Sequence, residues 1–293
     1  ISAADVNAIA KATEGKVTAT IADGTVAATL KAIKDVVSGD KITFKTTDTT
    51  VKATELKDLA ELVDTLDASS IKTITAAAAD VADVAAAAAV APTANVTITG
   101  SISAADAKTI AAATTGKVTA TLAADTADNI AAALDDNEVN AINVTVNGTT
   151  ASAKNLLDIK DSTSGKITVT AKEVSGSFDE LKELYITSKG KFTALGDENV
   201  TIIGTVSAAD ANIIAKAVNG KVTATTIEAD TAAALVASLK DAKATDELTL
   251  TVNGESAKAS DLLALDGKTS KDIVVNALNV TGNIADLTKV FAT

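Results

Sequence analysis

One stretch of this chain occurs three times, and the repetition limits the folds that the chain can adopt. The first copy, Ile1–Ile21, reads ISAADVNAIAKATEGKVTATI. It returns as ISAADAKTIAAATTGKVTATL from Ile102 and as VSAADANIIAKAVNGKVTATT from Val206. Near-identical segments so far apart need similar surroundings in the fold. A repeat architecture, in which each unit packs mainly against its neighbours, provides such surroundings.

Each copy predicts a short helix followed by a strand. Ser2 is a candidate N-cap, and Asp5 three residues later gives a capping-box arrangement with Asp in place of the usual Glu. Gly15 is expected to stop the helix. The segment Val17–Ile21 alternates apolar residues with threonine, a period of two that is typical of a half-buried strand.

The same alternation of helix and strand continues between the copies. Further helices are predicted at Thr25–Lys34, Glu55–Leu66 and Ala78–Val90, and strands at Lys41–Thr46, Ile71–Thr75, Val96–Thr99, Lys117–Leu122, Ile142–Val146, Lys166–Thr170, Asn199–Gly204, Lys221–Thr225, Glu247–Val252, Asp272–Ala277 and Asn279–Gly282. The chain thus divides into three super-repeats, 1–101, 102–205 and 206–293. The copies recur at intervals of about 101–104 residues and contain helix–strand units of about 25 residues, a length typical of repeat arrays.

Strands separated by one helix are expected to lie parallel in a sheet. Two architectures satisfy this expectation: a continuous solenoid, or three separate α/β domains. No linker rich in glycine, serine or proline separates the super-repeats, and the threonines leave one face of the sheet in water. We therefore predict an α/β helix–strand solenoid with a parallel sheet on one side and short helices on the other.

Composition excludes several classes of function. The net charge is −12 and all 26 basic residues are lysine, which argues against nucleic-acid binding because phosphate contacts need clustered basic side chains. The absence of cysteine excludes a disulfide scaffold. The longest apolar run, Val81–Pro92, is too short to span a bilayer. The chain does not begin with Met, and we expect it to be released from a longer precursor.

Residues with catalytic or metal-binding chemistry are few, because the chain has neither histidine nor cysteine. Two Ser–Lys pairs, Ser188-Lys189 and Ser270-Lys271, lack the surroundings of a nucleophile, and we interpret them as loop residues. The pairs Asp135-Asp136 and Asp197-Glu198 are also interpreted as loop charge, and they are the best candidates for calcium. We predict no enzyme, assign no catalytic or cofactor-binding residue, and leave calcium open.

Threonine pairs recur along the predicted strands, for example Thr97/Thr99 and Thr119/Thr121. Strands stacked in register would arrange these threonines in two ladders on an exposed face, an arrangement that resembles ice-binding solenoids. The alternative interpretation is that threonine is the ordinary residue for the wet face of a strand. Segments such as Thr201-Ile202-Ile203 interrupt the ladders.

The repeated helix–Gly–Lys-Val-Thr-Ala-Thr unit and the strands NVTITG at Asn95 and NVTIIG at Asn199 resemble the Ala/Thr-rich repeat regions of bacterial S-layer proteins and giant surface adhesins. The resemblance covers essentially the whole chain and is one of composition and repeat style. It implies export to the cell surface, self-association into a lattice or fibre, and calcium-dependent ordering.

We therefore predict an extracellular structural protein, the self-assembling subunit of a surface layer or fibre. Exposed solenoid ends and sheet edges favour contacts between copies, so a homo-oligomer, lattice or filament is expected. One alternative is the rigid stalk of a surface adhesin, and another is an ice-binding threonine face.

Overall fold

A computed structural model describes residues 1–134 and 140–292 as a mixed α/β protein. Contacts within the chain group these residues into two compact units. Unit 1 comprises Ile1–Ala123, Ala132–Val144 and Asp161–Gly165, and unit 2 comprises Ala124–Ala131, Thr145–Lys160 and Lys166–Thr293. The three super-repeats are a division of the sequence and stay a prediction.

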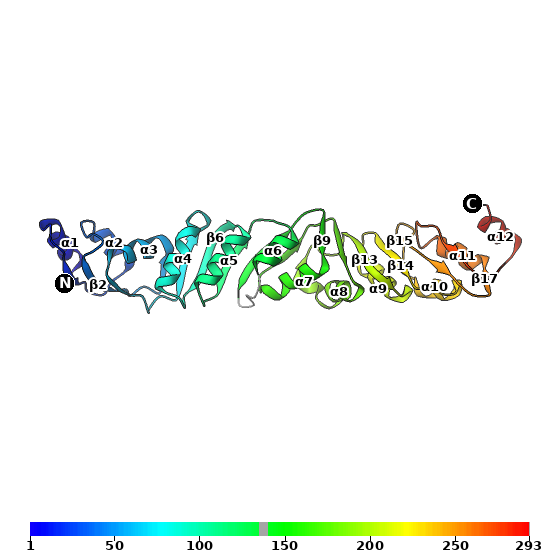
Figure 1. The fold of residues 1–293 in the computed structure, drawn as a ribbon, viewed down its shortest axis with the longest axis horizontal. Coiled ribbons are helices and arrows are strands. Elements are labelled where there is room, and N and C mark those ends of the chain that lie inside the picture. Colours follow the sequence, from blue (N-terminus) through cyan, green and yellow to red (C-terminus); the bar gives the residue numbers. More distant parts are fainter. Residues whose placement is uncertain (135–139, 293) are drawn as a thin grey trace. The chain divides into compact units, whose positions relative to one another are not determined.

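Helices and strands alternate along both units (Figure 1). The α-helices of the described residues are α1 Ala3–Ala12, α2 Val26–Ala32, α3 Ala53–Leu62, α4 Val81–Val90, α5 Ala104–Ala113, α6 Ala127–Ala133, α7 Ala153–Ser162, α8 Phe178–Lys182, α9 Ala208–Ala217, α10 Ala232–Ser238, α11 Ala259–Asp266 and α12 Ile284–Val290. A 3₁₀ turn, Ala78–Asp80, precedes α4, and a π-helix, Glu183–Thr187, follows α8.

The strands are short. In chain order they are β1 Thr18–Thr20, β2 Lys41–Lys45, β3 Thr50–Lys52, β4 Thr65–Asp67, β5 Thr73–Ala77, β6 Asn95–Ile102, β7 Val118–Leu122, β8 Ala141–Val146, β9 Thr150–Ser152, β10 Ile167–Val169, β11 Glu173–Gly176, β12 Phe192–Thr193, β13 Asn199–Val206, β14 Val222–Ile227, β15 Glu247–Leu248, β16 Thr251–Val252, β17 Ser256–Lys258, β18 Val274–Val275 and β19 Asn279–Thr281.

Neighbouring strands pair in parallel, as predicted for strands separated by a helix. In unit 1, β1, β2 and β4 form one set of paired strands, and β3, β5, β6, β7 and β8 form another. Thr73 lies beside Asn95 and Thr119 lies beside Ala141, so these partners are 22 positions apart in the sequence. The α/β class is confirmed.

Unit 2 has the same kind of pairing. Strands β9, β11, β13, β14 and β15 form a five-stranded sheet, and β10 with β12, β16 with β18 and β17 with β19 form parallel pairs. Glu173 lies beside Asn199, 26 positions later, and Ser256 lies beside Asn279, 23 positions later. The spacing therefore varies by a few residues.

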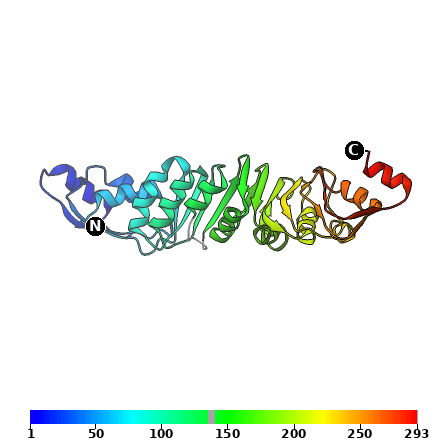
Figure 2. The same cartoon turned by 45° about the vertical axis from the view of Figure 1, so that its right-hand side comes forward.

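The strands alternate in burial because apolar and polar residues alternate in sequence. In β2, Ile42 and Phe44 are fully buried while Lys41, Thr43 and Lys45 are exposed. Helices cover the apolar side: in unit 1, α3 packs on α4 and α4 packs on α5 (Figure 1 and Figure 2). The core is therefore a layer of small aliphatic side chains between strands and helices.

One predicted helix is too long. The expectation for Glu55–Leu66 fails at its end, because α3 stops at Leu62 and Val63 is extended. Leu66 belongs to β4 instead, where it lies beside Phe44 of β2. The leucine spacing alone favoured a helix, but pairing with the neighbouring strand is decided by contacts remote in sequence.

The helix caps differ in detail from the predicted capping box. The Ser2 hydroxyl oxygen accepts from the Asp5 N–H at 3.1 Å and donates to the Asp5 carboxylate at 2.7 Å. A full capping box occurs at α8, where the Glu180 carboxylate also accepts from the N–H of the N-cap Ser177. The aspartate, one methylene shorter, bonds to the serine hydroxyl instead.

Helix α1 ends at Ala12, three residues before Gly15, with Thr13 as an extended C-cap, and Gly15 does not adopt a positive φ. Its equivalents Gly116 and Gly220 are also absent from the glycines with positive φ. A Cβ on Gly116 would lie 2.2 Å from the carbonyl oxygen of Ala94, and one on Gly220 would lie 2.1 Å from that of Glu198. Glycine is needed here because the backbone of the neighbouring strand passes close by.

Candidate functional site

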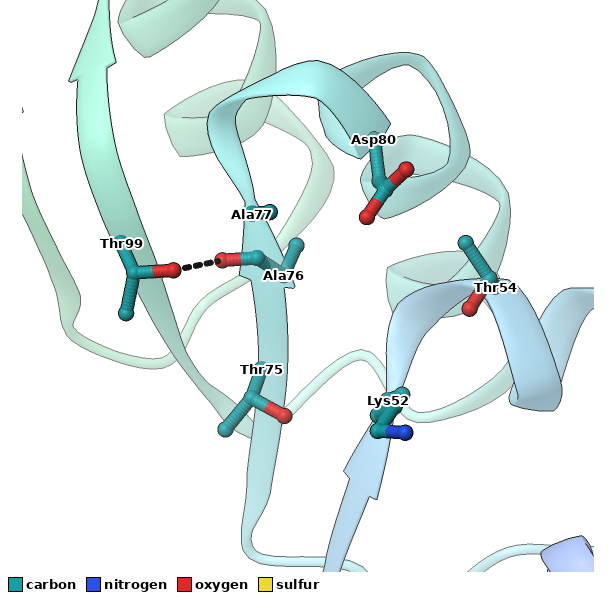
Figure 3. Close-up of a pocket in the computed structure, with 7 residues that line it drawn as sticks. All are labelled: Lys52, Thr54, Thr75, Ala76, Ala77, Asp80 and Thr99. Carbon is teal, nitrogen blue, oxygen red and sulfur yellow. Dashed lines mark hydrogen bonds between the residues drawn. The ribbon is translucent and has the colours of Figure 1, made fainter.

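A pocket of about 510 Å³ in unit 1 lies at the carboxyl ends of the parallel strands β3 and β5, beside the middle of β6, and such strand ends are where α/β proteins usually bind ligands. Its lining comprises Lys52, Thr54, Thr75, Ala76, Ala77, Asp80 and Thr99 (Figure 3). Lys52, Thr54 and Asp80 lie on the α3 side of β5, and Thr99 lies on the other side (Figure 3).

The polar groups of this pocket are partly used within the fold. The Thr99 hydroxyl donates to the carbonyl of Ala76 at 3.3 Å, and the Thr75 hydroxyl donates to the carbonyl of Val51 at 3.2 Å. The Lys52 ammonium lies 3.3 Å from the Glu55 carboxylate. The polar lining consists of three threonines, one lysine and one aspartate, which can offer hydrogen bonds to a ligand.

The two Ser–Lys pairs are used separately. The Ser188 hydroxyl donates to the Glu183 carboxylate at 2.6 Å, and the Lys189 ammonium donates to the carbonyl of Ala217. The Ser270 hydroxyl donates to the carbonyl of Asp246 at 3.0 Å. The loop interpretation is wrong for Ser188-Lys189, because Ser188 is buried between the π-helix and a 3₁₀ helix, Lys189–Lys191, and both side chains bond to helix residues.

The carboxylate pair Asp197-Glu198 does not converge on one point. The Asp197 carboxylate accepts from the Asn219 side chain at 2.7 Å, whereas the Glu198 carboxylate is buried and accepts from the Gly196 N–H at 3.0 Å. The other pair, Asp135-Asp136, lies outside the described residues. Within residues 1–134 and 140–292, no group of three or more acidic residues could hold a metal ion. Calcium binding therefore stays a prediction.

Three buried polar residues lie directly before a strand, and their side chains accept hydrogen bonds from the backbone of the neighbouring strand. Asp40, Asn140 and Asp246 are at most 5% exposed, although two of them are carboxylates. Each accepts a hydrogen bond from the N–H that begins the preceding strand segment: Val17 to Asp40 at 2.8 Å, Val118 to Asn140 at 2.8 Å, and Val222 to Asp246 at 2.9 Å. These side chains therefore replace a backbone partner that the strand start lacks.

Buried hydroxyls do the same one strand further along. The Thr163 hydroxyl oxygen accepts from the Ile142 N–H at 2.9 Å, and the Thr269 hydroxyl oxygen accepts from the Leu248 N–H at 2.9 Å. Among the described residues, no buried side-chain nitrogen or oxygen is without a hydrogen-bond partner. The hydrogen-bonding capacity of these buried side chains is thus used in contacts between successive strands.

Unit 2 contains one buried pair with no counterpart in unit 1. Tyr185 lies in the π-helix, and its hydroxyl donates to the carboxylate of Glu198, which stands directly before β13. Burial and the adjacent carboxylate raise the pKa of Tyr185 well above its ordinary value. Ala94 precedes β6 at the matching place in unit 1. The pair was not predicted from the sequence, because neither residue belongs to the repeated pattern.

The predicted threonine ladders are short. In the strand register, Thr75, Thr97 and Thr119 are successive partners, and the row ends at Lys52 on one side and Ala141 on the other. In β1, β2 and β4 the row comprises Thr20, Thr43 and Thr65. The ice-binding alternative stays a prediction.

Comparisons of the chain with protein-family models, with curated proteins and with solved structures find no match. In the part of the chain that the structure describes, no helix is both long enough and apolar enough to cross a membrane.

Proposed function

We propose that the protein is a structural, self-assembling subunit of an extracellular surface layer or fibre, built as a helix–strand solenoid. The observation that carries the proposal is the use of the buried polar side chains. Asp40, Asn140 and Asp246 each hold the backbone of a neighbouring strand instead of pointing into a shared cavity. Because these buried polar groups are hydrogen-bonded to neighbouring strands, they favour a structural role for the protein over a catalytic one.

The solenoid interpretation is supported by the parallel pairing at regular spacing. Residues 22 or 23 positions apart are neighbours at several places in each unit, for example Thr50 and Thr73 in unit 1 and Thr150 and Glu173 in unit 2. Inner strands such as β5 and β11 thus pair with one earlier and one later strand, which is the contact pattern of repeat arrays.

Assembly between copies is supported by the exposed apolar side chains. Ile203 of β13 is 60% exposed, and Val37 after α2 is 61% exposed. An acidic surface carrying separate apolar residues remains soluble at low concentration and can associate by burying them. Surface localisation is proposed from the resemblance to surface-layer repeats.

Negative-stain electron microscopy of the purified chain, with calcium and then with a chelator, tests this proposal. Ordered sheets or filaments are the expected result, and their loss in chelator would assign calcium to the contacts. Separate rods in both conditions would favour the adhesin-stalk alternative. Compact globules would contradict the solenoid.

A further inference from the structure

Three asparagines of unit 2 stand directly before a glycine, in the pairs Asn147-Gly148, Asn219-Gly220 and Asn253-Gly254. Such a pair can lose ammonia without an enzyme, because a glycine has no side chain to keep its backbone nitrogen from the side-chain amide carbon of the preceding asparagine. The reaction requires the asparagine side chain and the backbone that follows it to approach each other. Contacts that restrain either group therefore decide which pair reacts.

The Asn147-Gly148 pair lies in the exposed turn between β8 and β9. The backbone N–H of Asn147 donates to the carbonyl of Asp125 at 2.8 Å, whereas its side-chain amide has no hydrogen-bond partner among residues 1–134 and 140–292. A Cβ added at Gly148 would lie 3.8 Å from its nearest neighbours, so the glycine has space around it. Both reacting groups can therefore move toward each other.

The Asn219-Gly220 pair is restrained by hydrogen bonds and by packing. The side-chain amide of Asn219 donates to the carboxylate of Asp197 at 2.7 Å, and the ammonium of Lys243 donates to the backbone carbonyl of Asn219 at 3.0 Å. A Cβ added at Gly220 would lie 2.1 Å from the carbonyl oxygen of Glu198, so a neighbouring backbone passes directly beside this glycine. The two reacting groups cannot approach each other without breaking these contacts.

The Asn253-Gly254 pair is restrained less than Asn219-Gly220 and more than Asn147-Gly148. The side-chain oxygen of Asn253 accepts one neutral hydrogen bond, from the side-chain amide of Asn276 at 3.2 Å. The nearest atom to a Cβ added at Gly254 is the methyl group of Thr231 at 3.5 Å. One hydrogen bond thus holds the side chain, and the glycine keeps its space.

The matching turn of the first super-repeat has no asparagine. The Thr47 N–H donates to the carbonyl of Gly24 at 2.8 Å, and the N–H groups of Asn147 and Asn253 make the equivalent hydrogen bonds to neighbouring turns. The residue after Thr47 is Asp48, whose carboxylate is hydrogen-bonded within this turn. The turn therefore accommodates a carboxylate, which is the group that deamidation creates.

We propose that Asn147 is a site of spontaneous deamidation, that Asn253 reacts more slowly, and that the fold protects Asn219. The backbone nitrogen of Gly148 forms a bond to the side-chain amide carbon of Asn147. The bond from that carbon to the amide nitrogen breaks, and ammonia leaves with the proton that the Gly148 nitrogen gives up. Water then opens the succinimide ring at one of its two carbonyls, which gives aspartate or isoaspartate and adds one negative charge.

Incubation of the purified chain in mildly alkaline buffer, followed by peptide mapping with mass spectrometry, tests this ranking. The amide of Asn147 is expected to be lost about tenfold or more faster than that of Asn219, because reaction at Asn219 requires the loss of a hydrogen bond to a carboxylate. The rate at Asn253 should lie between the two. Anion-exchange chromatography should show a more acidic species that elutes with the Asn147→Asp protein.

The same incubation in urea is the control for local sequence. All three pairs have glycine after asparagine, so the unfolded chain should lose the three amides at similar rates. A ranking that is present in the folded protein and absent in the unfolded chain is thereby assigned to the fold.

Asp197→Ala tests the contact that protects Asn219. The variant removes the acceptor of the Asn219 side chain, so deamidation at Asn219 should become about tenfold faster while the rate at Asn147 stays unchanged. Asp272→Ala is the matched control, because Asp272 is exposed and its side chain has no hydrogen-bond partner in the described part of the chain. Circular dichroism checks that both variants are folded, and if Asp197→Ala is not, the three rates in the unaltered protein decide.

Three results would overturn the inference: an Asn147 amide that persists in the folded protein although the unfolded chain loses it, equal rates at Asn147 and Asn219 in the folded protein, or an Asn219 rate that folded Asp197→Ala leaves unchanged. The inference is independent of the proposed function. Deamidation is measured on separate molecules, whereas the proposed function fails if the protein forms no ordered assembly. Deamidation without assembly would leave the modification site standing and remove the subunit role.

Discussion

The hydroxyl of Tyr185 donates a hydrogen bond to the carboxylate of Glu198, and both side chains are buried in unit 2. Burial and the nearby carboxylate raise the pKa of Tyr185, so the folded protein keeps the phenol neutral to higher pH than the unfolded chain does. The contribution of this phenol to stability is complete below the unfolded pKa of about 10 and decreases as the pH rises above it.

We expect the free energy of unfolding to fall as the pH is raised above about 10, since the unfolded chain then loses a proton that the folded chain keeps. Tyr185 is the single tyrosine of the chain, which has no tryptophan. Tyrosinate absorbance therefore reports this residue alone. Denaturant unfolding at stepped pH, followed with absorbance titration of the folded protein, measures both quantities. Ionisation of the folded protein near pH 10 would contradict the burial argument.

Tyr185→Phe removes the donated hydrogen bond and leaves the Glu198 carboxylate with the Gly196 N–H. We expect a loss of about 1–3 kcal/mol at neutral pH, since a buried acceptor loses one partner. In the variant, the free energy of unfolding should fall less steeply with pH above about 10, because no tyrosine ionises. An unchanged slope above pH about 10 would assign that slope to lysine groups instead.

Glycines that face a neighbouring backbone should be intolerant of a methyl group. Gly116→Ala and Gly220→Ala place a Cβ 2.2 and 2.1 Å from a backbone carbonyl oxygen, far inside the closest approach of non-bonded atoms, and we expect each to cost about 3 kcal/mol or more because the backbone must move. Thermal and denaturant unfolding measure the loss. Gly15→Ala is the control with the same local sequence, and equal destabilisation of all three variants would contradict the explanation.

The repeated elements could be predicted from the sequence because their signals are local. Serine caps at Ser2, Ser103 and Ser207 and the Lys-Val-Thr-Ala-Thr alternation gave helices and strands at the right places, and the one-helix spacing gave parallel pairing. The close approach of a neighbouring backbone to Gly116 and Gly220 was not predicted, because a contact with residues 22 positions away leaves no local sign in the sequence.

The side-chain hydrogen bonds that Asp40, Asn140 and Asp246 make to neighbouring strands could partly have been predicted from the sequence. Asp40, Asn140 and Asp246 each stand before a strand at corresponding places in the three super-repeats, so an alignment of the copies could have found them. In a single copy, an Asp or Asn before a strand cannot be distinguished by sequence as either an exposed turn residue or a buried hydrogen-bond acceptor. The contact between Tyr185 and Glu198 could not be predicted, because it joins a π-helix to a strand start at places that differ between copies.

Removing the hydrogen bonds that Asp246 accepts should destabilise unit 2. The Asp246 carboxylate accepts from the Val222 N–H at 2.9 Å and from the Lys243 N–H at 2.8 Å, and it is fully buried. Asp246→Ala leaves the buried N–H of Val222 and the partly buried N–H of Lys243 without this acceptor, and we expect a loss of about 2–5 kcal/mol. Denaturant unfolding measures the loss.

Asp246→Asn is the conservative control for these hydrogen bonds. It keeps one acceptor oxygen, as Asn140 does naturally for Val118, and should cost less than Asp246→Ala. Equal effects of the two substitutions would show that the charge, and not the accepted hydrogen bond, carries the stabilisation.

Ala194 is the one residue other than glycine with a positive φ, 59°, in the described chain. The left-handed region costs an alanine roughly 1–2 kcal/mol, and glycine avoids that strain at an entropic cost of about 0.5–1 kcal/mol. Ala194→Gly should therefore raise the free energy of unfolding by up to about 1 kcal/mol. Ala233→Gly, at an exposed position of α10, should lower it by about 1 kcal/mol. If both substitutions destabilise equally, the turn at Ala194 is not strained.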